Sequence, residues 1–178
     1  KSYNCDVLFG AELNCYPKFN KAALDNIFPK DIKNKYINGG LYIGYVKNIK
    51  NILTWKSTNE MQAICKNGTD QAYFTKYFIE NHDKVNIKLD IDSKIFQCMH
   101  LVPWIDIEFK NGRIFNSKQK TYSCFIHFNG GVLVTYDKKT KIMPEYIEKL
   151  KLSRTNPDKT FNIYEYLHQQ NMGNYSKG

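Results

Sequence analysis

The stretch at residues 36–45, with the sequence YINGGLYIGY, constrains the fold of this chain most. Its Asn-Gly-Gly sequence is typical of a tight turn, and the apolar and aromatic residues after it are typical of a buried strand. Glycine is needed where the backbone adopts positive φ or lies close against another group. The Asn38 amide can donate and accept hydrogen bonds, so this place also suits a ligand. We therefore expect either an ordinary turn or a ligand-binding turn at Asn38, Gly39 and Gly40.

Short apolar segments on both sides of this stretch predict further strands. We expect these strands at residues 5–13, 85–90, 94–98, 105–109, 113–115 and 122–126. Asn111 and Gly112 lie between two of the segments and predict a β-hairpin with a type I′ turn.

Apolar residues at helical spacing predict the helices. We expect a short helix near residues 21–27 and longer helices at 46–58 and 71–80. At the C-terminus we expect either two helices, at 143–152 and 161–170 with a polar loop at 153–160 between them, or one helix and a tail. Thr69 or Asp70 is placed to cap the helix at 71–80. The residues expected on its buried face are Ala72, Tyr73, Tyr77 and Phe78. The pattern predicts an α/β fold, and 178 residues are enough for one domain.

Three side chains near the ends of predicted elements are candidates for binding or chemistry. Glu12 follows an apolar strand, and ligands of open α/β sheets bind at the carboxyl ends of strands. Asp70 is either a helix cap or a carboxylate available for chemistry. His127 is either a core or turn residue, or an imidazole directed at a metal or a phosphate. In the second case, backbone amides of Asn129, Gly130 and Gly131 would bind an anion beside it.

The composition narrows the function classes. The formal net charge is +9, but only Arg113 and Arg154 are arginines and the lysines form no dense block. We therefore expect no nucleic-acid partner, whereas a positive field also favours a small anion such as a nucleotide diphosphate. No apolar run approaches the roughly 18 to 20 residues that a membrane span requires. The cysteines show no CxxC spacing, which argues against a zinc site.

Six sequence blocks occur in an order that resembles a known family. The blocks are FGAELNCYP, INGGLYIGY, TDQAYFTKYF, VNIKLD followed by SKIFQ, FKNGR and IHFNG. Together they resemble the glycosyltransferase domain of the procollagen lysyl hydroxylases and the related collagen galactosyl- and glucosyltransferases. The resemblance covers residues 7–131, and six blocks in the same order are far more specific than any one of them.

The resemblance implies a GT-A fold, which is a Rossmann-like α/β fold that binds a UDP-sugar together with Mn²⁺ or another divalent cation. The reaction it implies moves a hexose from UDP-glucose or UDP-galactose to a hydroxyl acceptor, a collagen-like hydroxylysine or galactosyl-hydroxylysine. By block matching, His127 falls on a metal-ligand histidine, Asp70 on an aspartate that faces the transferring sugar, and Asn38 on an asparagine near the sugar. The full set of expected donor- or substrate-binding residues is Glu12, Asn38, Gly39, Gly40, Gln71, Asn129 and Gly130. We expect Asn38, Asp70 and His127 to border one hollow at the carboxyl ends of a single sheet.

The family's Asp-x-x-Asp metal motif and its first nucleotide-binding strands would lie N-terminal to Phe9. We therefore expect the N-terminal portion of the same protein to be missing from this chain. We also expect a GT-A-like catalytic portion at residues 1–131 and a C-terminal helical extension of the same domain at 132–178. The family works in the lumen of the endoplasmic reticulum, whereas the many lysines and asparagines fit a viral or AT-rich source. A place of action in the host cytoplasm therefore also stays open.

Functions of different classes are compatible with the sequence. The first is a metal-dependent glycosyltransferase that uses a UDP-sugar. The second is a non-catalytic glycan- or protein-binding module on a degenerate glycosyltransferase scaffold. Carboxylates that complete a metal site with His127 would favour the enzyme. A third, a basic RNA-binding module, predicts a steep salt dependence of oligonucleotide binding.

Overall fold

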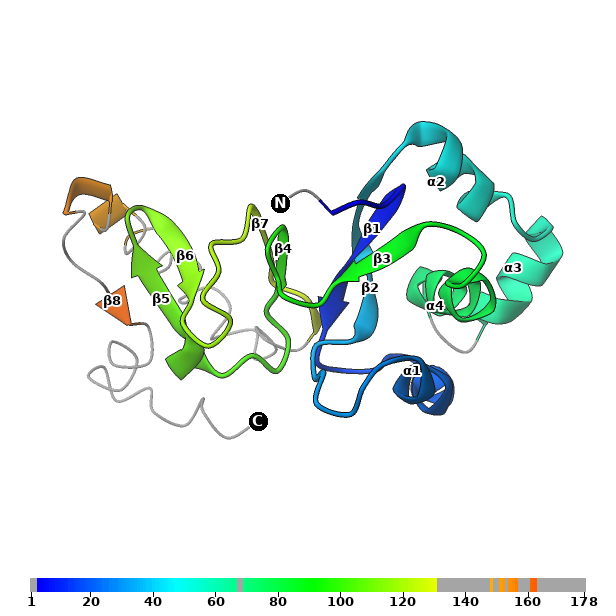
Figure 1. Cartoon of the computed structure of the whole chain (residues 1–178), viewed down its shortest axis with the longest axis horizontal. Helices are drawn as coiled ribbons and strands as arrows, with labels where there is room; N and C mark the ends of the chain where they lie inside the picture. Colours follow the sequence, from blue (N-terminus) through cyan, green and yellow to red (C-terminus); the bar gives the residue numbers. More distant parts are fainter. Residues whose placement is uncertain are drawn as a thin grey trace. The chain divides into compact units, whose positions relative to one another are not determined.

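The computed structural model describes residues 3–66, 69–130, 148, 151–152, 154–156 and 161–162 (Figure 1). The chain forms two compact units, Lys1–Ile91 and Asp92–Gly178. Strands and helical segments occur in both, which confirms the predicted α/β class. In the described part of the chain, no helix is long and apolar enough to cross a bilayer. Most of residues 132–178 lie outside the described residues, so the predicted division at residue 131 stays a prediction.

A mixed sheet with the strand order β2-β1-β3 forms the centre of the first unit. Strand β1 (Val7–Glu12) pairs antiparallel with β2 (Tyr36–Gly44) and parallel with β3 (Ile87–Asp90). All of β1 is buried, which explains its nearly continuous apolar sequence. The strands predicted at residues 5–13 and 85–90 are thus confirmed, with shorter ends.

The Asn-Gly-Gly sequence lies inside β2, so the predicted turn is wrong. Phe9 pairs with Tyr42, but the next residue, Gly10, pairs with Asn38, so residues 39–41 form a bulge in the β1–β2 ladder. Neither glycine of the bulge has positive φ. A bulge absorbs extra residues within a paired strand, which is why the chain continues straight through this sequence. The strand is buried only in its first half, so the prediction of a buried segment after the glycines is also wrong.

The helices of the first unit follow the predicted pattern closely. They are α1 (Lys21–Ile27), α2 (Val46–Leu53), α3 (Thr58–Cys65) and α4 (Asp70–Asn81), and a 3-10 turn, η1 (Lys18–Asn20), precedes α1. Helix α1 is confirmed, α2 is shorter than predicted, and α4 begins one residue earlier than predicted.

Sequence reasoning missed helix α3. A capping box starts this helix: Ser57 Oγ accepts a hydrogen bond from Glu60 N at 3.4 Å, and Glu60 Oε2 accepts one from Ser57 N at 3.0 Å. The Ser-x-x-Glu spacing at residues 57–60 is the sequence signal that would have predicted the helix start.

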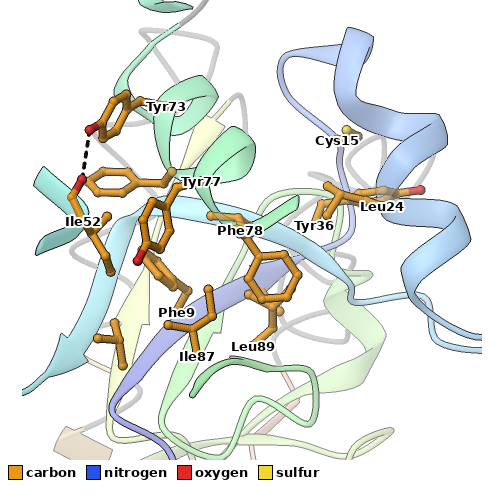
Figure 2. Packing of buried hydrophobic residues seen from close by; sticks show 14 residues of the cluster. Phe9, Cys15, Leu24, Tyr36, Ile52, Tyr73, Tyr77, Phe78, Ile87 and Leu89 are labelled. Carbon is orange, nitrogen blue, oxygen red and sulfur yellow. Dashed lines mark hydrogen bonds between the residues drawn. The ribbon is translucent and has the colours of Figure 1, made fainter. Parts of the chain in front are cut away.

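Buried aromatic residues join α4 to the sheet (Figure 2). The predicted buried face of α4 is confirmed, since Ala72, Tyr73, Tyr77 and Phe78 are all buried. The ring centroids of Phe9 on β1 and Phe74 on α4 lie 5.5 Å apart. The Tyr73 hydroxyl donates to Ile52 O at 2.9 Å, as the dashed line in Figure 2 shows. This packing fixes α4 against the sheet, and the first turn of the helix reaches the carboxyl end of β1.

The described residues of the second unit form two small sheets. In one, β4 (Phe96–Cys98) pairs parallel with β7 (Phe125–His127). In the other, β5 (Ile107–Lys110) pairs with β6 (Arg113–Asn116) and β8 (Phe161–Asn162), and a 3-10 turn, η2 (Trp104–Asp106), precedes β5. Asn111 and Gly112 have φ values of 54° and 69°, which confirms the type I′ turn of the predicted hairpin.

The C-terminal helix predictions are partly wrong. Residues 161–162 belong to β8 because the free edge of β5 pairs with them, so the second helix does not begin there. Arg154 and Thr155 are helical although a loop was predicted from residue 153. Asn156 N donates to Leu152 O at 3.0 Å, and this turn stops before Pro157, which disfavours helix in the preceding residue. Glu148 is helical as predicted, and the rest of both predicted helices lies largely outside the described residues.

Candidate functional site

Polar side chains from three elements meet at the carboxyl end of β1. Glu12 is the last residue of β1, Asn38 lies on β2, and Gln71 lies in the first turn of α4. Gln71 Nε2 donates to Glu12 Oε1 at 2.8 Å, and Asn38 Nδ2 lies 3.5 Å from the same oxygen. All three residues are buried. A buried carboxylate needs hydrogen-bond donors, so Glu12 fixes the orientation of both side-chain amides.

The two glycines of the β2 bulge join the same network. Gly39 N donates to Gln71 Oε1 at 3.1 Å, and Gly40 N donates to Asn38 Oδ1 at 3.0 Å. A Cβ atom at Gly39 would lie 2.9 Å from Gln71 Cα, so only glycine allows β2 and α4 to approach this closely. The expectation that glycine lies close against another group is confirmed here, and that group is the start of a helix.

The carbonyl oxygen of Tyr16 completes the environment of the Gln71 amide. It accepts a second hydrogen bond from Gln71 Nε2 at 2.9 Å. Sequence reasoning did not single out Tyr16, a residue that is 48% exposed. Because the contact spans 55 positions in sequence, no local pattern could have revealed it.

Asp70 begins α4 next to this network, and its two carboxylate oxygens differ. Its Oδ1 accepts a hydrogen bond from Gln71 N at 2.9 Å, and Thr69 Oγ1 accepts from the same N–H at 3.3 Å. Thr69 is thus the N-cap of α4, and Asp70 is the first residue of the helix, where its Oδ1 supports the cap by binding the same backbone N–H. Asp70 is exposed, and Oδ2 has no hydrogen-bond partner within the part of the chain that the structure describes. One oxygen thus holds the helix start while the other can reach a ligand.

His127 ends β7 in the second unit. Strand β7 pairs with β4 in a separate sheet. His127 therefore does not share a sheet with Asn38, and the expectation of a single sheet for both residues is wrong. Burial lowers the pKa of His127 below its ordinary value, since desolvation disfavours the charged imidazolium. A neutral imidazole is the form that binds a metal.

Asn129 uses its side chain to close the loop that follows β4. Its Oδ1 accepts hydrogen bonds from Met99 N and His100 N, both at 3.0 Å. Gly130 has a φ of 60°, and a Cβ atom there would lie 2.7 Å from Nδ1 of His100. Sequence reasoning did not single out His100, because its position beside Gly130 follows from the pairing of β4 with β7, which the sequence does not show. Anion binding by the backbone amides of Asn129 and Gly130 stays a prediction.

The described residues fit a divalent metal only in part. His127 suits one position in a coordination shell. Among residues 3–66, 69–130 and the short C-terminal stretches described, no group of three or more His, Cys, Asp or Glu side chains is placed to hold a metal ion. Mn²⁺ prefers oxygen ligands, so a complete site would require further carboxylates.

Comparisons with known proteins agree with the resemblance of the sequence blocks. A family model described as the PLOD GT domain matches residues 1–154. A procollagen-lysine,2-oxoglutarate 5-dioxygenase of Drosophila melanogaster is 30% identical over 139 residues, which are 73% of this chain and 18% of the relative. An uncharacterized protein of Acanthamoeba polyphaga mimivirus is 35% identical over 130 residues, which are 70% of this chain and 24% of the relative.

A third relative carries the activity in its name. A multifunctional procollagen lysine hydroxylase and glycosyltransferase of Caenorhabditis elegans is 28% identical over 130 residues, which are 70% of this chain and 17% of the relative. The chain therefore spans between 17% and 24% of the length of these three relatives. Because the family model covers most of the chain, the chain belongs to the PLOD GT domain family, a family of glycosyltransferase domains.

Proposed function

We propose that this domain transfers a hexose from UDP-glucose or UDP-galactose to a hydroxyl group. The observation that carries the proposal is the meeting of Glu12, Asn38, Asp70 and Gln71 at the carboxyl end of β1, in a chain of a glycosyltransferase family. Ligands of α/β folds bind at that end of the strands. The exposed carboxylate of Asp70, beside amides that the network holds in place, suits a hydroxyl group of a sugar.

Asp70 is the proposed catalytic residue. Its Oδ2 can accept a hydrogen bond from a sugar hydroxyl, and its negative charge would stabilise the positive charge that develops at the anomeric carbon in the transition state. The bond from Gln71 N to Oδ1 holds the carboxylate in one orientation. A carboxylate that is already oriented requires no rearrangement as the charge develops.

Glu12 is proposed as a positioning residue for two donor-binding amides. Its Oε1 accepts from Gln71 Nε2 and lies within hydrogen-bonding distance of Asn38 Nδ2. Gln71 Oε1 in turn holds Gly39 N–H, and Asn38 Oδ1 holds Gly40 N–H. The bulge of β2 and the first turn of α4 are thus held in fixed positions where we propose that the donor sugar binds.

We propose a divalent cation such as Mn²⁺ as the cofactor, with His127 as one ligand. The other ligands would be carboxylates of the same protein outside the described residues. The bound cation would neutralise the diphosphate leaving group as a Lewis acid. The lowered pKa of His127 supports this role, because it keeps the imidazole neutral at physiological pH.

We propose a collagen-like hydroxylysine or galactosyl-hydroxylysine as the acceptor. The names of the Drosophila and Caenorhabditis relatives both contain procollagen lysine, which supports an acceptor of this class.

The experiment is an assay of UDP release by the complete protein, with UDP-glucose and with UDP-galactose, in the presence and absence of Mn²⁺. Release that depends on Mn²⁺ is the expected result. His127→Ala should abolish this release while circular dichroism shows an intact fold. Unchanged turnover of the variant would remove His127 from the site, and no release from either sugar would overturn the transferase proposal.

A non-catalytic glycan- or protein-binding module is the second candidate. The described residues hold no group of three metal-ligating side chains, which favours this alternative. Such a module would bind a glycan or a protein without releasing UDP, and a chelator would not change its affinity. The UDP-release assay therefore separates the two functions.

A further inference from the structure

A groove of about 580 Å³ lies in the first unit beside the Glu12 network. It is lined by residues of α1, by the segment that leads from α1 to β2, and by Leu13 and Tyr36. Leu13 directly follows Glu12, and Tyr36 is the partner of Glu12 in the β1–β2 ladder. A volume of this size is typical of small-ligand sites, which cover about 300 to 1,000 Å³. The groove thus adjoins the end of β1 where we propose that the sugar is transferred.

The lining of this groove carries an excess of positive charge. Its charged residues are Lys21, Lys30, Lys33, Lys35 and Asp25, so four positive charges minus one negative charge leave a net charge of +3. Asp31 belongs to the same segment but is exposed and does not line the groove.

Asp25 is the carboxylate of the groove, and three neighbours already share it. Lys21 forms an ion pair with its Oδ2, Lys35 Nζ lies 3.1 Å from its Oδ1, and the Tyr36 hydroxyl donates to Oδ1 at 2.8 Å. Lys21, Tyr36 and Lys35 hold the pKa of Asp25 well below its usual range. The Asp25 carboxylate, the single negative charge of the lining, therefore already forms ion pairs with Lys21 and Lys35.

The positive charges of the groove outnumber its negative charge, so not every lysine can have a carboxylate partner of its own. Lys30 and Lys33 are exposed and form no ion pair within the described part of the chain. The Lys35 side chain is only 9% exposed, which is rare for lysine unless it is paired, and it shares its carboxylate with Lys21. Lysine ammonium groups commonly bind phosphate and carboxylate oxyanions. An anion in the groove would balance the charge that Asp25 leaves uncompensated.

We propose that this groove binds an oxyanion, a carboxylate or a phosphate group, carried by the acceptor. The assignment to the acceptor rests on the proposed transferase function, because the groove lies beside the network proposed to bind the donor sugar. The oxyanion site itself rests only on the lysines, the shared carboxylate and the volume of the groove. The function that follows is selection of acceptor peptides in which an Asp or Glu side chain lies near the reacting hydroxylysine.

Binding of inorganic phosphate, measured by calorimetry at constant ionic strength, tests the oxyanion site. The variant is Lys30→Gln with Lys33→Gln, and the matched control is Lys47→Gln with Lys50→Gln, two exposed lysines of α2 that lose the same charge. We expect the groove variant to bind phosphate about tenfold more weakly and the control to change less than about twofold. Equal affinities of both variants, or no binding by the wild-type protein, would overturn the proposal. All four lysines are exposed, so both variants should fold.

The affinity for UDP identifies the source of the oxyanion. The groove variant should bind UDP as tightly as the control, because the acceptor and not the donor is expected in the groove. A selective loss of UDP affinity in the groove variant would assign the groove to the donor phosphates and overturn the acceptor assignment. Phosphate binding in a protein that releases no UDP would uphold the oxyanion site while the transferase proposal fails, so the two failures are distinguishable.

Discussion

The two units use their polar side chains in different ways at the ends of their strands. In the first unit, Glu12, Asn38 and Gln71 bind one another and the backbone of the β2 bulge. In the second unit, Asn129 binds backbone amides that follow β4. The first arrangement orients a set of amides beside the exposed carboxylate of Asp70, whereas the second closes a loop. Similar residue types thus form a candidate binding site in one unit and a structural support in the other.

This difference shows that a polar residue at a strand end is not by itself a sign of function. What distinguishes the first unit is that three elements supply the network and that one carboxylate oxygen keeps no partner among the described residues. In the second unit, His127 is the side chain whose chemistry still points to a ligand, because burial keeps it neutral. Each of the substitutions below tests one side of this contrast.

Glu12→Ala should have the largest effect on stability. The change removes the shared acceptor of two buried amides and the acceptor is charged, so we expect a loss of about 3 kcal/mol in the free energy of unfolding. Glu12→Gln keeps a side-chain oxygen at the same position, so its loss in the free energy of unfolding should be smaller. Urea unfolding of both variants measures the difference. A loss below about 1 kcal/mol for Glu12→Ala would show that the network does not hold the end of β1 together.

Gly39→Ala should destabilise the first unit by about 2 kcal/mol, because the new methyl group would collide with the backbone of Gln71 and push α4 away from β2. The matched variant is Gly40→Ala at the neighbouring exposed position, which should lose clearly less stability. Equal losses in urea unfolding would contradict the close approach between strand and helix. We also expect Gly39→Ala to weaken UDP-sugar turnover, since the displaced Gln71 no longer orients Gly39 N–H.

Asn129→Ala should lower the free energy of unfolding by about 1 kcal/mol, the smallest of the three losses. His100 N would lose its acceptor, whereas Met99 N would keep a second one, the carbonyl of His127 at 2.9 Å. Asn129→Asp retains a side-chain oxygen and is the matched control. Thermal unfolding and UDP release should be measured together for both variants. If Asn129→Ala kept full stability but lost turnover, Asn129 would belong to the site and the contrast between the units would fail.

Much of the fold could be predicted because its signals are local. Thr69 and the spacing of Tyr73, Tyr77 and Phe78 gave helix α4 to within one residue at each end. Asn-Gly at residues 111–112 specified the hairpin, since both residues must adopt positive φ in a type I′ turn.

The omission of α3 was an oversight of a local signal, whereas the errors in the strands arose where pairing between distant segments decides the structure. The bulge in β2 depends on its register with β1, and the Asn-Gly-Gly sequence alone favours a turn. Strand β8 forms only because β5 offers a free edge. Neither the bulge in β2 nor strand β8 can be predicted from the spacing of apolar residues in the sequence.

The sequence could predict which residues belong to the candidate site, but not how these residues contact one another. Glu12 was expected from its place at a strand end, and the sequence blocks indicated Asn38 and Asp70. The bond from Gln71 to Glu12 spans 59 positions, so only the folded chain shows that these residues support one another. The lysine groove was missed for the same reason, because only the folded chain shows that Lys35 is buried beside Asp25.

The central claim is that the end of β1 carries the transfer chemistry, and Asp70→Asn tests it most directly. Thr69 remains as the N-cap and asparagine keeps an oxygen that can accept from Gln71 N, so the fold should be preserved while the carboxylate charge is lost. Turnover of the UDP-sugar should fall at least about 100-fold while the affinity for UDP changes less than about twofold. Asp83→Asn, at an exposed position after α4, should change neither. Equal losses of turnover and UDP affinity in Asp70→Asn, or no loss at all, would contradict the claim and leave Asp70 as a helix cap.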